Sequence, residues 1–300
     1  MRKFLLVLSI ITLLAATTLV SGCGDNGEVE SEGDFQGRLM LTGSSTLAPT
    51  IAQIADAFAG EFGTWDQVDA TLPNKEIQID ISTGGSGVGA KAVIDGTANF
   101  GMLARDAREE EKELIEDFQE FKVGIDALLL AVHPENPIAE TRENLTKEEI
   151  REIFSGNAVT WNDFDSTLPD RDIVLLVRDL GGGANRVFQS SVMGDEEVSS
   201  SAIEAPSMSS LVGRLAENTD AIGYASFGMV NRHEAELVAF NVEDIAPTEE
   251  NILEGTYPIA RSLYLVRSGD MSLAEQSFLE YIQSEKGHEI ISEMGFLPAL

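Results

Sequence analysis

Short apolar runs alternate with amphipathic stretches along most of the chain, and this alternation limits the possible fold more than any other feature of the sequence. Helical periodicity is clear over Ala48–Phe62, where Ile51, Ile54 and Phe58 recur on one face, and over Glu109–Phe121. Strands are expected at residues 38–42, 77–82, 100–103, 127–133, 173–178, 221–225 and 262–266. Strands separated by helices predict an α/β protein with a largely parallel sheet.

Local signals place the ends of other helices. Thr146 is a candidate N-cap, and Glu149 stands three residues later, where it completes a capping box. Residues 273–294 are expected to form one or two terminal helices. The acidic run Glu109–Glu111 is interpreted as a solvated helix face.

The first 35 residues have the character of an export signal and a tether. Arg2 and Lys3 precede an almost uncharged apolar stretch over residues 4–20. The following Leu19-Val20-Ser21-Gly22-Cys23 resembles a bacterial lipobox, in which the cysteine is lipidated and becomes the new N-terminus. We therefore predict a signal peptide over 1–22, and a lipidated Cys23 with an acidic tether over 23–35. The mature chain would lie outside the cytoplasm, anchored to the cell membrane.

The charge of the chain excludes some classes of function. Asp and Glu number 51 against 20 Lys and Arg, which gives a formal charge of −31. A broad basic surface for nucleic acid is therefore excluded. The excess of carboxylates, with few lysines, favours a saline environment in which salt screens self-repulsion. The single cysteine excludes an internal disulfide and any CxxC metal site.

Three strand-to-helix turns carry the polar residues that suggest a ligand site. They span Gly43–Pro49, Ser82–Gly89 and Arg178–Arg186, and all are rich in Gly, Ser or Asn. A helix N-terminus exposes unpaired N–H groups and a partial positive charge, so each turn could hold an anion. The alternative for any single turn is a capped α/β connection without a ligand. Together the three turns favour one anion held from several sides, with Arg178 as a cation beside it.

The usual parts of a cofactor site or a catalytic site are missing from the sequence. Neither the dinucleotide fingerprint nor the P-loop pattern occurs. His133, His233 and His288 are too scattered to suggest a metal cluster. No serine stands in a Gly-x-Ser-x-Gly elbow. We therefore expect a protein that is not an enzyme and that has no cofactor and no metal.

Around these turns the sequence resembles the phosphate-binding proteins of phosphate ABC transporters, which belong to the two-lobed periplasmic-binding-protein superfamily. The resemblance covers residues 38 to 300. It rests on short motifs in matching order: Gly43-Ser44-Ser45-Thr46 with Pro49, Gly84-Gly85-Ser86-Gly87 with Gly89, Phe100-Gly101-Met102 with Arg105, Gly124-Ile125-Asp126, the stretch Leu145–Gly156 followed by Trp161-Asn162, Arg178 with its glycine-rich turn, and Ile222-Gly223-Tyr224.

This resemblance implies two α/β lobes, each a mostly parallel sheet flanked by helices, with a ligand cleft between them. The first lobe would combine 36–124 with 226–300, and the second would be 125–225. Phosphate would be held without a metal. By motif position, the ligands would be Thr46, the main chain of Leu47, Ser86, Arg178 and the main chain of Gly183 and Ala184, with Ser45 nearby.

The sequence departs from the family pattern at three positions: Gly182, Ala184 and Ala104. The usual Ser-Gly-Thr after the arginine is Gly182-Gly183-Ala184, and the usual Ser or Asp before Arg105 is Ala104. Each missing donor to a buried oxyanion costs about 1–3 kcal/mol. Groups that could compensate are Arg105, Asn185 and Arg186.

A proton acceptor would separate phosphate from sulfate, because monohydrogen phosphate carries a proton that a buried carboxylate can accept. Asp126 is the first candidate, with a purely structural role as its alternative, and Asp179 is the second. The function implied is capture of inorganic phosphate and delivery to an ABC permease by a monomeric receptor. The alternatives are another tetrahedral oxyanion (sulfate, molybdate or arsenate) and a ligand-free adhesive or sensory envelope protein.

Overall fold

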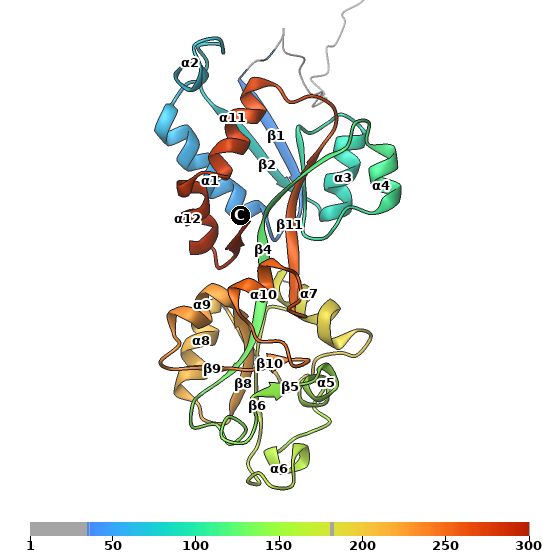
Figure 1. Ribbon diagram of the computed structural model, residues 1–300, viewed down its shortest axis with the longest axis vertical. Helices are drawn as coiled ribbons and strands as arrows, with labels where there is room; N and C mark the ends of the chain where they lie inside the picture. Colours follow the sequence, from blue (N-terminus) through green and yellow to red (C-terminus); the bar gives the residue numbers. More distant parts are fainter. Residues whose placement is uncertain (1–34, 36, 181–182, 300) are drawn as a thin grey trace, which may run out of the picture.

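Two long strands, β4 (Gln119–Val132) and β11 (Ala260–Arg267), run between two lobes that lie one above the other in Figure 1. The computed structural model describes residues 35, 37–180 and 183–299. The strands follow the order β2-β1-β3-β11-β4-β8-β6-β7, so β4 belongs to the sheets of both lobes. The two-lobed α/β architecture expected from the sequence is confirmed.

The first lobe combines the beginning and the end of the described chain. Its parallel strands are β1, β2 and β3, and β11 joins β3 in the antiparallel direction. The lobe contains, besides β4 and β11, the elements β1 (Arg38–Gly43), α1 (Ala48–Phe62), α2 (Trp65–Val68), β2 (Gln78–Thr83), α3 (Ser86–Ile94), β3 (Phe100–Leu103), α4 (Glu109–Leu114), α11 (Leu273–Ile282), α12 (Glu285–Glu293) and β12 (Leu297–Pro298).

Helices cover both faces of this first sheet (Figure 1). On one face α1 and α11 pack their apolar sides together, and Ile54, Phe58 and Phe278 are buried there. On the other face α3 contributes Val93, which packs with Leu103 of β3. The first lobe therefore has a hydrophobic core of its own.

The second lobe is built around the second half of β4. There β8 pairs antiparallel with β4, and β6 and β7 continue the sheet in the parallel direction. Its elements are β5 (Asn144–Leu145), α5 (Lys147–Phe154), α6 (Trp161–Phe164), β6 (Val174–Arg178), α7 (Gly183–Phe188), the π-helical turn η1 (Gln189–Met193), β7 (Ile203–Ala205), α8 (Met208–Glu217), β8 (Ala221–Ser226), α9 (Phe227–Arg232), β9 (Val238–Ala239), β10 (Asn241–Val242) and α10 (Glu249–Leu253).

The boundary between the lobes differs from the sequence expectation at its second crossing. Residues 226–259 were expected in the first lobe, yet Val230, Phe240, Ile252 and Ile259 are buried in the core of the second. The chain returns to the first lobe only along β11. The reason is that β9 pairs with β4 and β10 with β5, and both pairings lie in the second lobe.

Local signals in the sequence predicted several helix ends correctly. Thr146 caps α5, with its hydroxyl accepting from the Glu149 amide while the Glu149 carboxylate accepts from the Thr146 amide. The helix expected over Glu109–Phe121 is too long, since α4 ends at Leu114 and β4 begins at Gln119. Residues from Gln119 pair with β11, and this long-range pairing outweighs the local helical pattern.

The predicted signal peptide, Cys23 and nearly all of the tether lie outside the described residues. Across residues 35, 37–180 and 183–299, no helix is both long and apolar enough to span a membrane.

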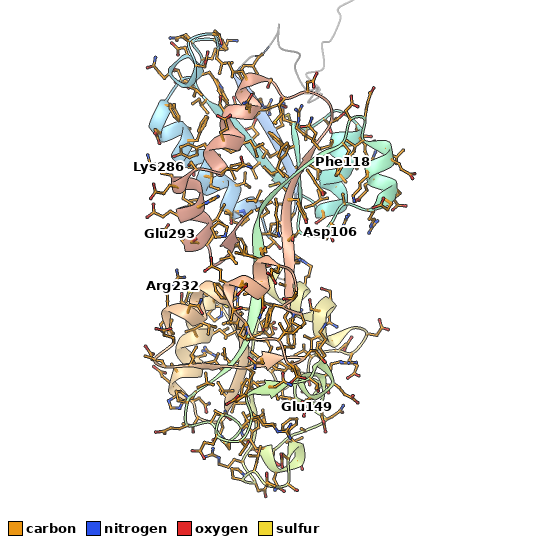
Figure 2. The ribbon with its side chains drawn as sticks, viewed as in Figure 1. Asp106, Phe118, Glu149, Arg232, Lys286 and Glu293 are labelled. Atoms are coloured by element: carbon orange, nitrogen blue, oxygen red, sulfur yellow. The ribbon has the colours of Figure 1, made fainter. Side chains whose placement is uncertain are left out.

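The acidity of the chain leads to a prediction about salt. Figure 2 shows charged side chains such as Glu293 and Lys286 on the outward side of α12. With a formal charge of −31, the folded protein carries strong self-repulsion that salt screens. We expect the thermal unfolding midpoint to rise by about 4 °C between low and molar NaCl, which corresponds to about 1–2 kcal/mol. Calorimetric scans in phosphate-free buffer measure this shift, and a constant or falling midpoint would contradict it.

Candidate functional site

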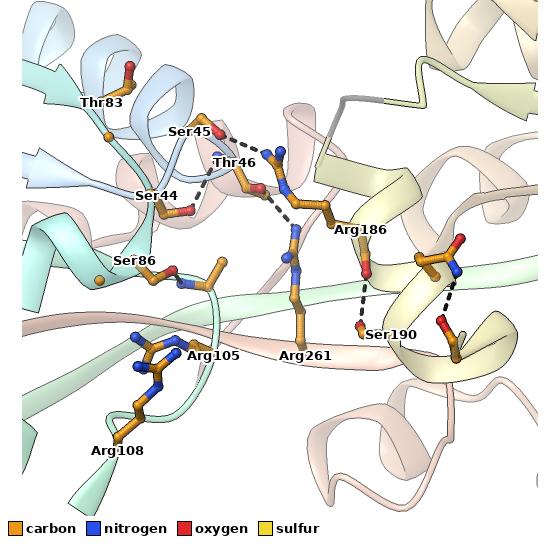
Figure 3. A pocket seen from close by; sticks show the side chains of 16 residues that line it. Ser44, Ser45, Thr46, Thr83, Ser86, Arg105, Arg108, Arg186, Ser190 and Arg261 are labelled. Carbon is orange, nitrogen blue, oxygen red and sulfur yellow. Dashed lines mark hydrogen bonds between the residues drawn. The ribbon is translucent and has the colours of Figure 1, made fainter. Parts of the chain in front are cut away.

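A cavity of ≈ 990 Å³ lies between the two lobes, next to the paired strands β4 and β11 that pass from one lobe to the other. Figure 3 shows it from close by. It is lined by Ser44, Ser45, Thr46, Thr83, Gly84, Gly85, Ser86, Gly87, Ala104, Arg105, Arg108, Arg186, Gln189, Ser190, Gly194 and Arg261. Residues of all three glycine-rich turns therefore line this cavity, the third turn through Arg186 of α7 alone, and η1 adds to the wall from the second lobe.

The first turn leads from β1 into α1. Gly43 has φ +135°, and a Cβ atom there would lie 2.3 Å from the carbonyl oxygen of Met102, so only glycine fits. The Ser44 hydroxyl accepts hydrogen bonds from the amides of Thr46 and Leu47 at 3.2 and 3.4 Å. This arrangement fixes Ser45 and Thr46 at the mouth of the cavity.

The second turn leads from β2 into α3. The amides of Gly84 and Gly85 donate to the Gly43 carbonyl, which ties the two turns together. The Ser86 hydroxyl, in the first turn of α3, accepts from the Ala104 amide at 3.1 Å. An oxygen that already accepts from a fixed donor can direct its own O–H toward a ligand. Ser86 therefore offers a hydrogen-bond donor to the cavity.

The crossing strands contribute an ion pair. Arg261 of β11 stands opposite Asp126 of β4, and the Arg261 Nη2 to Asp126 Oδ2 distance is 3.1 Å. The same Nη2 donates to the Thr46 hydroxyl at 2.9 Å and to the Gly183 carbonyl at 3.0 Å. Burial raises the pKa of the Asp126 carboxyl, while the positive charge of Arg261 acts in the opposite direction.

The second lobe reaches the first through α7. Arg186 Nη2 donates to the Ser45 hydroxyl at 2.7 Å, a contact visible in Figure 3. Gly183 packs against Thr46 so closely that a Cβ atom at Gly183 would lie 2.4 Å from the Thr46 hydroxyl oxygen. Absence of a side chain at Gly183 therefore lets the lobes approach each other here.

The wall of the cavity is positive in an otherwise acidic chain. Four arginines line it, and none of the described lining residues is an Asp or a Glu. Arg105 is paired with Glu111 by two bonds of 2.8 Å. Glu111 was expected to be solvated but is buried, and its hydrogen bond with Arg105 lowers the pKa of the Glu111 carboxyl. Within the described ranges, no group of three or more His, Cys, Asp or Glu side chains is placed to hold a metal ion.

Several of the residues predicted for the site do not line this cavity. Arg178 donates through Nη1 to the carbonyl of Ala205 on the neighbouring strand and is absent from the cavity lining. The side chain of Leu47 is buried in the core of the first lobe, and its main-chain amide, the predicted ligand, donates to the Ser44 hydroxyl at 3.4 Å. Asn185 is engaged within the second lobe, where it donates to the Leu180 carbonyl and accepts from the Tyr224 hydroxyl. The other candidates outside the lining are Asp126, Asp179, Gly183 and Ala184, and Gly182 lies outside the described residues.

Sequence reasoning missed Arg261 and Arg108. Arg261 lies inside a strand rather than in a turn, so a search for polar residues at strand ends passes over it. One signal is available in the sequence: Arg261 interrupts the apolar run of residues 259–266. A charged side chain in a buried strand requires a partner.

With this geometry in place, comparison with known proteins identifies the family. The family model of the PBP (periplasmic-binding-protein) superfamily domain matches residues 28–286. The chain belongs to the PBP superfamily. A curated relative of this PBP chain is the phosphate-binding protein PstS of Staphylococcus saprophyticus, 28% identical over 92% of this chain and 85% of the relative.

Solved structures agree with this PBP assignment. A possible phosphate-binding protein from Planctomyces limnophilus has a TM-score of 0.73 at 23% identity, over 88% of this chain and 93% of its own, and it supports the fold alone. A putative phosphate ABC transporter substrate-binding protein from Clostridium perfringens, solved with bound phosphate, has a TM-score of 0.58 at 26% identity. That comparison covers 88% of this chain and 100% of the other.

Proposed function

We propose that this chain captures inorganic phosphate in the cleft between its lobes and delivers it to an ABC permease. The names of its relatives support this ligand, since those proteins are phosphate-binding proteins and substrate-binding proteins of phosphate transporters. Binding would use hydrogen bonds and ion pairs alone, without a chemical step, a metal or a cofactor.

The observation that carries the proposal is the chemistry of the cavity wall. The hydroxyls of Ser45, Thr46 and Ser86 each accept from a fixed donor, so each has its own proton to give. Guanidinium groups stand beside them, and the described lining contains no carboxylate. A wall of donors requires a ligand made of acceptors, and a tetrahedral oxyanion is such a ligand.

The net charge of −31 does not prevent this capture. Fields of surface carboxylates decay over about 10 Å at 0.1 M salt, whereas the donors of the cleft act at contact distance. Because the cavity of ≈ 990 Å³ exceeds the size of one oxyanion, we propose that the lobes close further around the ligand.

The place of action in this proposal is the outer side of the cytoplasmic membrane. A lipid on Cys23 would hold the protein there, and the acidic residues after it would let the lobes reach the permease as a monomer. Mass spectrometry of the mature N-terminus tests the anchor: a diacylated Cys23 supports it, and an unmodified thiol contradicts it.

Titration calorimetry tests the ligand. We expect phosphate to bind in the micromolar range or tighter. Sulfate, molybdate and arsenate are titrated at the same pH and salt concentration for comparison. If the protein binds one of the other oxyanions more tightly than phosphate, that oxyanion is its ligand and the proposal of phosphate is wrong. No heat with any of them would contradict the proposal and favour a ligand-free envelope protein.

Ser86 provides a second prediction. Replacing Ser86 with alanine removes a donor to the anion and leaves the Ala104 amide without its acceptor. We expect phosphate affinity to fall about 10- to 100-fold, in line with about 1–3 kcal/mol for a lost buried hydrogen bond. Ser277→Ala is the matched control, because the Ser277 hydroxyl bonds only to Leu273 of its own helix α11, away from the cleft. Equal affinities of the two variants would remove Ser86 from the site.

A further inference from the structure

Arg261 occupies an unusual position in the cleft. It stands on one of the two crossing strands, its side chain is 18% exposed, and its guanidinium lies between both lobes. Figure 3 shows the side chain rising from β11 toward Thr46. No sequence motif points to this residue.

The two terminal nitrogens of Arg261 have very different surroundings. Nη2 carries two hydrogens but faces three acceptors: the Thr46 hydroxyl, the Gly183 carbonyl and Asp126 Oδ2. Nη1 also carries two hydrogens, and it has no hydrogen-bond partner among the described residues. Since Arg261 lines the cavity, the donors of Nη1 are available to a ligand there.

Asp126 holds this guanidinium in place. Its Oδ2 accepts from both Nε and Nη2 of Arg261, at 3.3 and 3.1 Å. The Asp126 side chain is only 4% exposed and does not line the cavity. A ligand in the cavity therefore meets the arginine and not the carboxylate.

We propose that Arg261 is a direct anion ligand of the cleft through Nη1, and that Asp126 is the positioning residue that orients it. This inference rests on the proposed function, and it differs from the sequence expectation, in which Asp126 accepts the proton of the phosphate. A guanidinium held in this way attracts phosphate and sulfate alike. Asp126 then contributes to the strength of binding of both anions and not to the choice between them.

A double-mutant cycle tests the two roles. The variants are Arg261→Met, Asp126→Asn and the combination of both, and titration calorimetry with phosphate and with sulfate is the readout. We expect Arg261→Met to weaken phosphate binding by about 30-fold or more, because a charge-assisted hydrogen bond is lost. Asp126→Asn should weaken both anions by the same factor, about 10-fold. In the Arg261→Met background, Asp126→Asn should add less than about twofold.

The same set of variants also serves as a control for misfolding. Each single variant leaves one buried charge without its partner, whereas the double variant removes both charges and should fold well. Thermal unfolding of all variants verifies this. Arg232→Met is the matched control for the loss of one positive charge, because Arg232 lies on α9 and is exposed; its phosphate affinity should match the wild type.

Three results would overturn the inference. Phosphate affinity of the double variant within about threefold of the wild type would remove Arg261 as a ligand. A changed phosphate-to-sulfate ratio in Asp126→Asn would return the acceptor role to Asp126. Absence of binding by the wild type to any oxyanion would overturn this inference together with the proposed function, whereas the first two results leave phosphate capture intact.

Discussion

Replacing Gly183 with valine is expected to weaken phosphate binding about 100-fold while leaving the protein folded. Gly183 begins α7 and lies against Thr46 of the opposite lobe, where a Cβ atom would be 2.4 Å from Thr46 Oγ1 and 3.2 Å from Thr46 Cβ. Valine adds three carbons at this contact, so the lobes must separate. Donors from the two lobes then no longer reach one ligand together, and each lost donor costs about 1–3 kcal/mol.

The matched control for Gly183→Val is Gly213→Val. Gly213 lies in α8, and a Cβ atom there meets no other atom within 4 Å. We expect its phosphate affinity to equal that of the wild type. Small-angle X-ray scattering should show a larger radius of gyration for Gly183→Val in the presence of phosphate. If Gly183→Val binds phosphate within about threefold of the wild type, the contact between Gly183 and Thr46 is not part of closure.

The second large effect is expected from Gly43→Ala, and it acts on stability. Gly43 has φ +135°, and its Cβ position is 2.3 Å from the Met102 carbonyl oxygen and 3.0 Å from the Met102 nitrogen. These neighbours are backbone atoms, so no rotation of a side chain relieves the clash. We expect a loss of about 3 kcal/mol or more and a fall of about 6–12 °C in the unfolding midpoint.

Binding should also weaken in Gly43→Ala, because the Gly43 carbonyl accepts from the amides of Gly84 and Gly85 and so aligns two turns of the cleft. Gly60→Ala is its control: Gly60 lies in α1, and nothing lies within 4 Å of its Cβ position. That variant should be as stable as the wild type or more stable by up to about 1 kcal/mol. An unfolding midpoint for Gly43→Ala equal to that of Gly60→Ala would show that the turn tolerates a side chain.

Features governed by neighbours in the sequence could be predicted. The bounds of α1 match the expectation at both ends, and the capping box of Thr146 and Glu149 is present. Turns belong to the same class, because Gly, Ser and Thr at a strand end favour particular backbone conformations regardless of distant contacts. For this reason the two turns that carry Thr46 and Ser86 could be predicted from the sequence, and the resemblance to the phosphate-binding family then pointed to these two residues within them.

Features governed by strand pairing could not be predicted in this way. Arg178 stands beside a glycine-rich turn in the sequence, yet its register partner on β7 is Ala205, whose carbonyl takes the guanidinium. Arg261 comes next to Asp126 only because β11 pairs with β4 in one register, across 135 residues of chain. The position of Arg261 in the cleft is thus set by long-range pairing, which a single sequence does not reveal.

A crystal structure of the protein grown with phosphate tests most directly whether these hydroxyl and guanidinium donors converge on one anion in the cleft between the lobes. The expected result is a tetrahedral density in the cleft within about 3 Å of Thr46 Oγ1, Ser86 Oγ and Arg261 Nη1. Density for phosphate at another place on the chain, with these three side chains turned away from it, would contradict the assignment of the site.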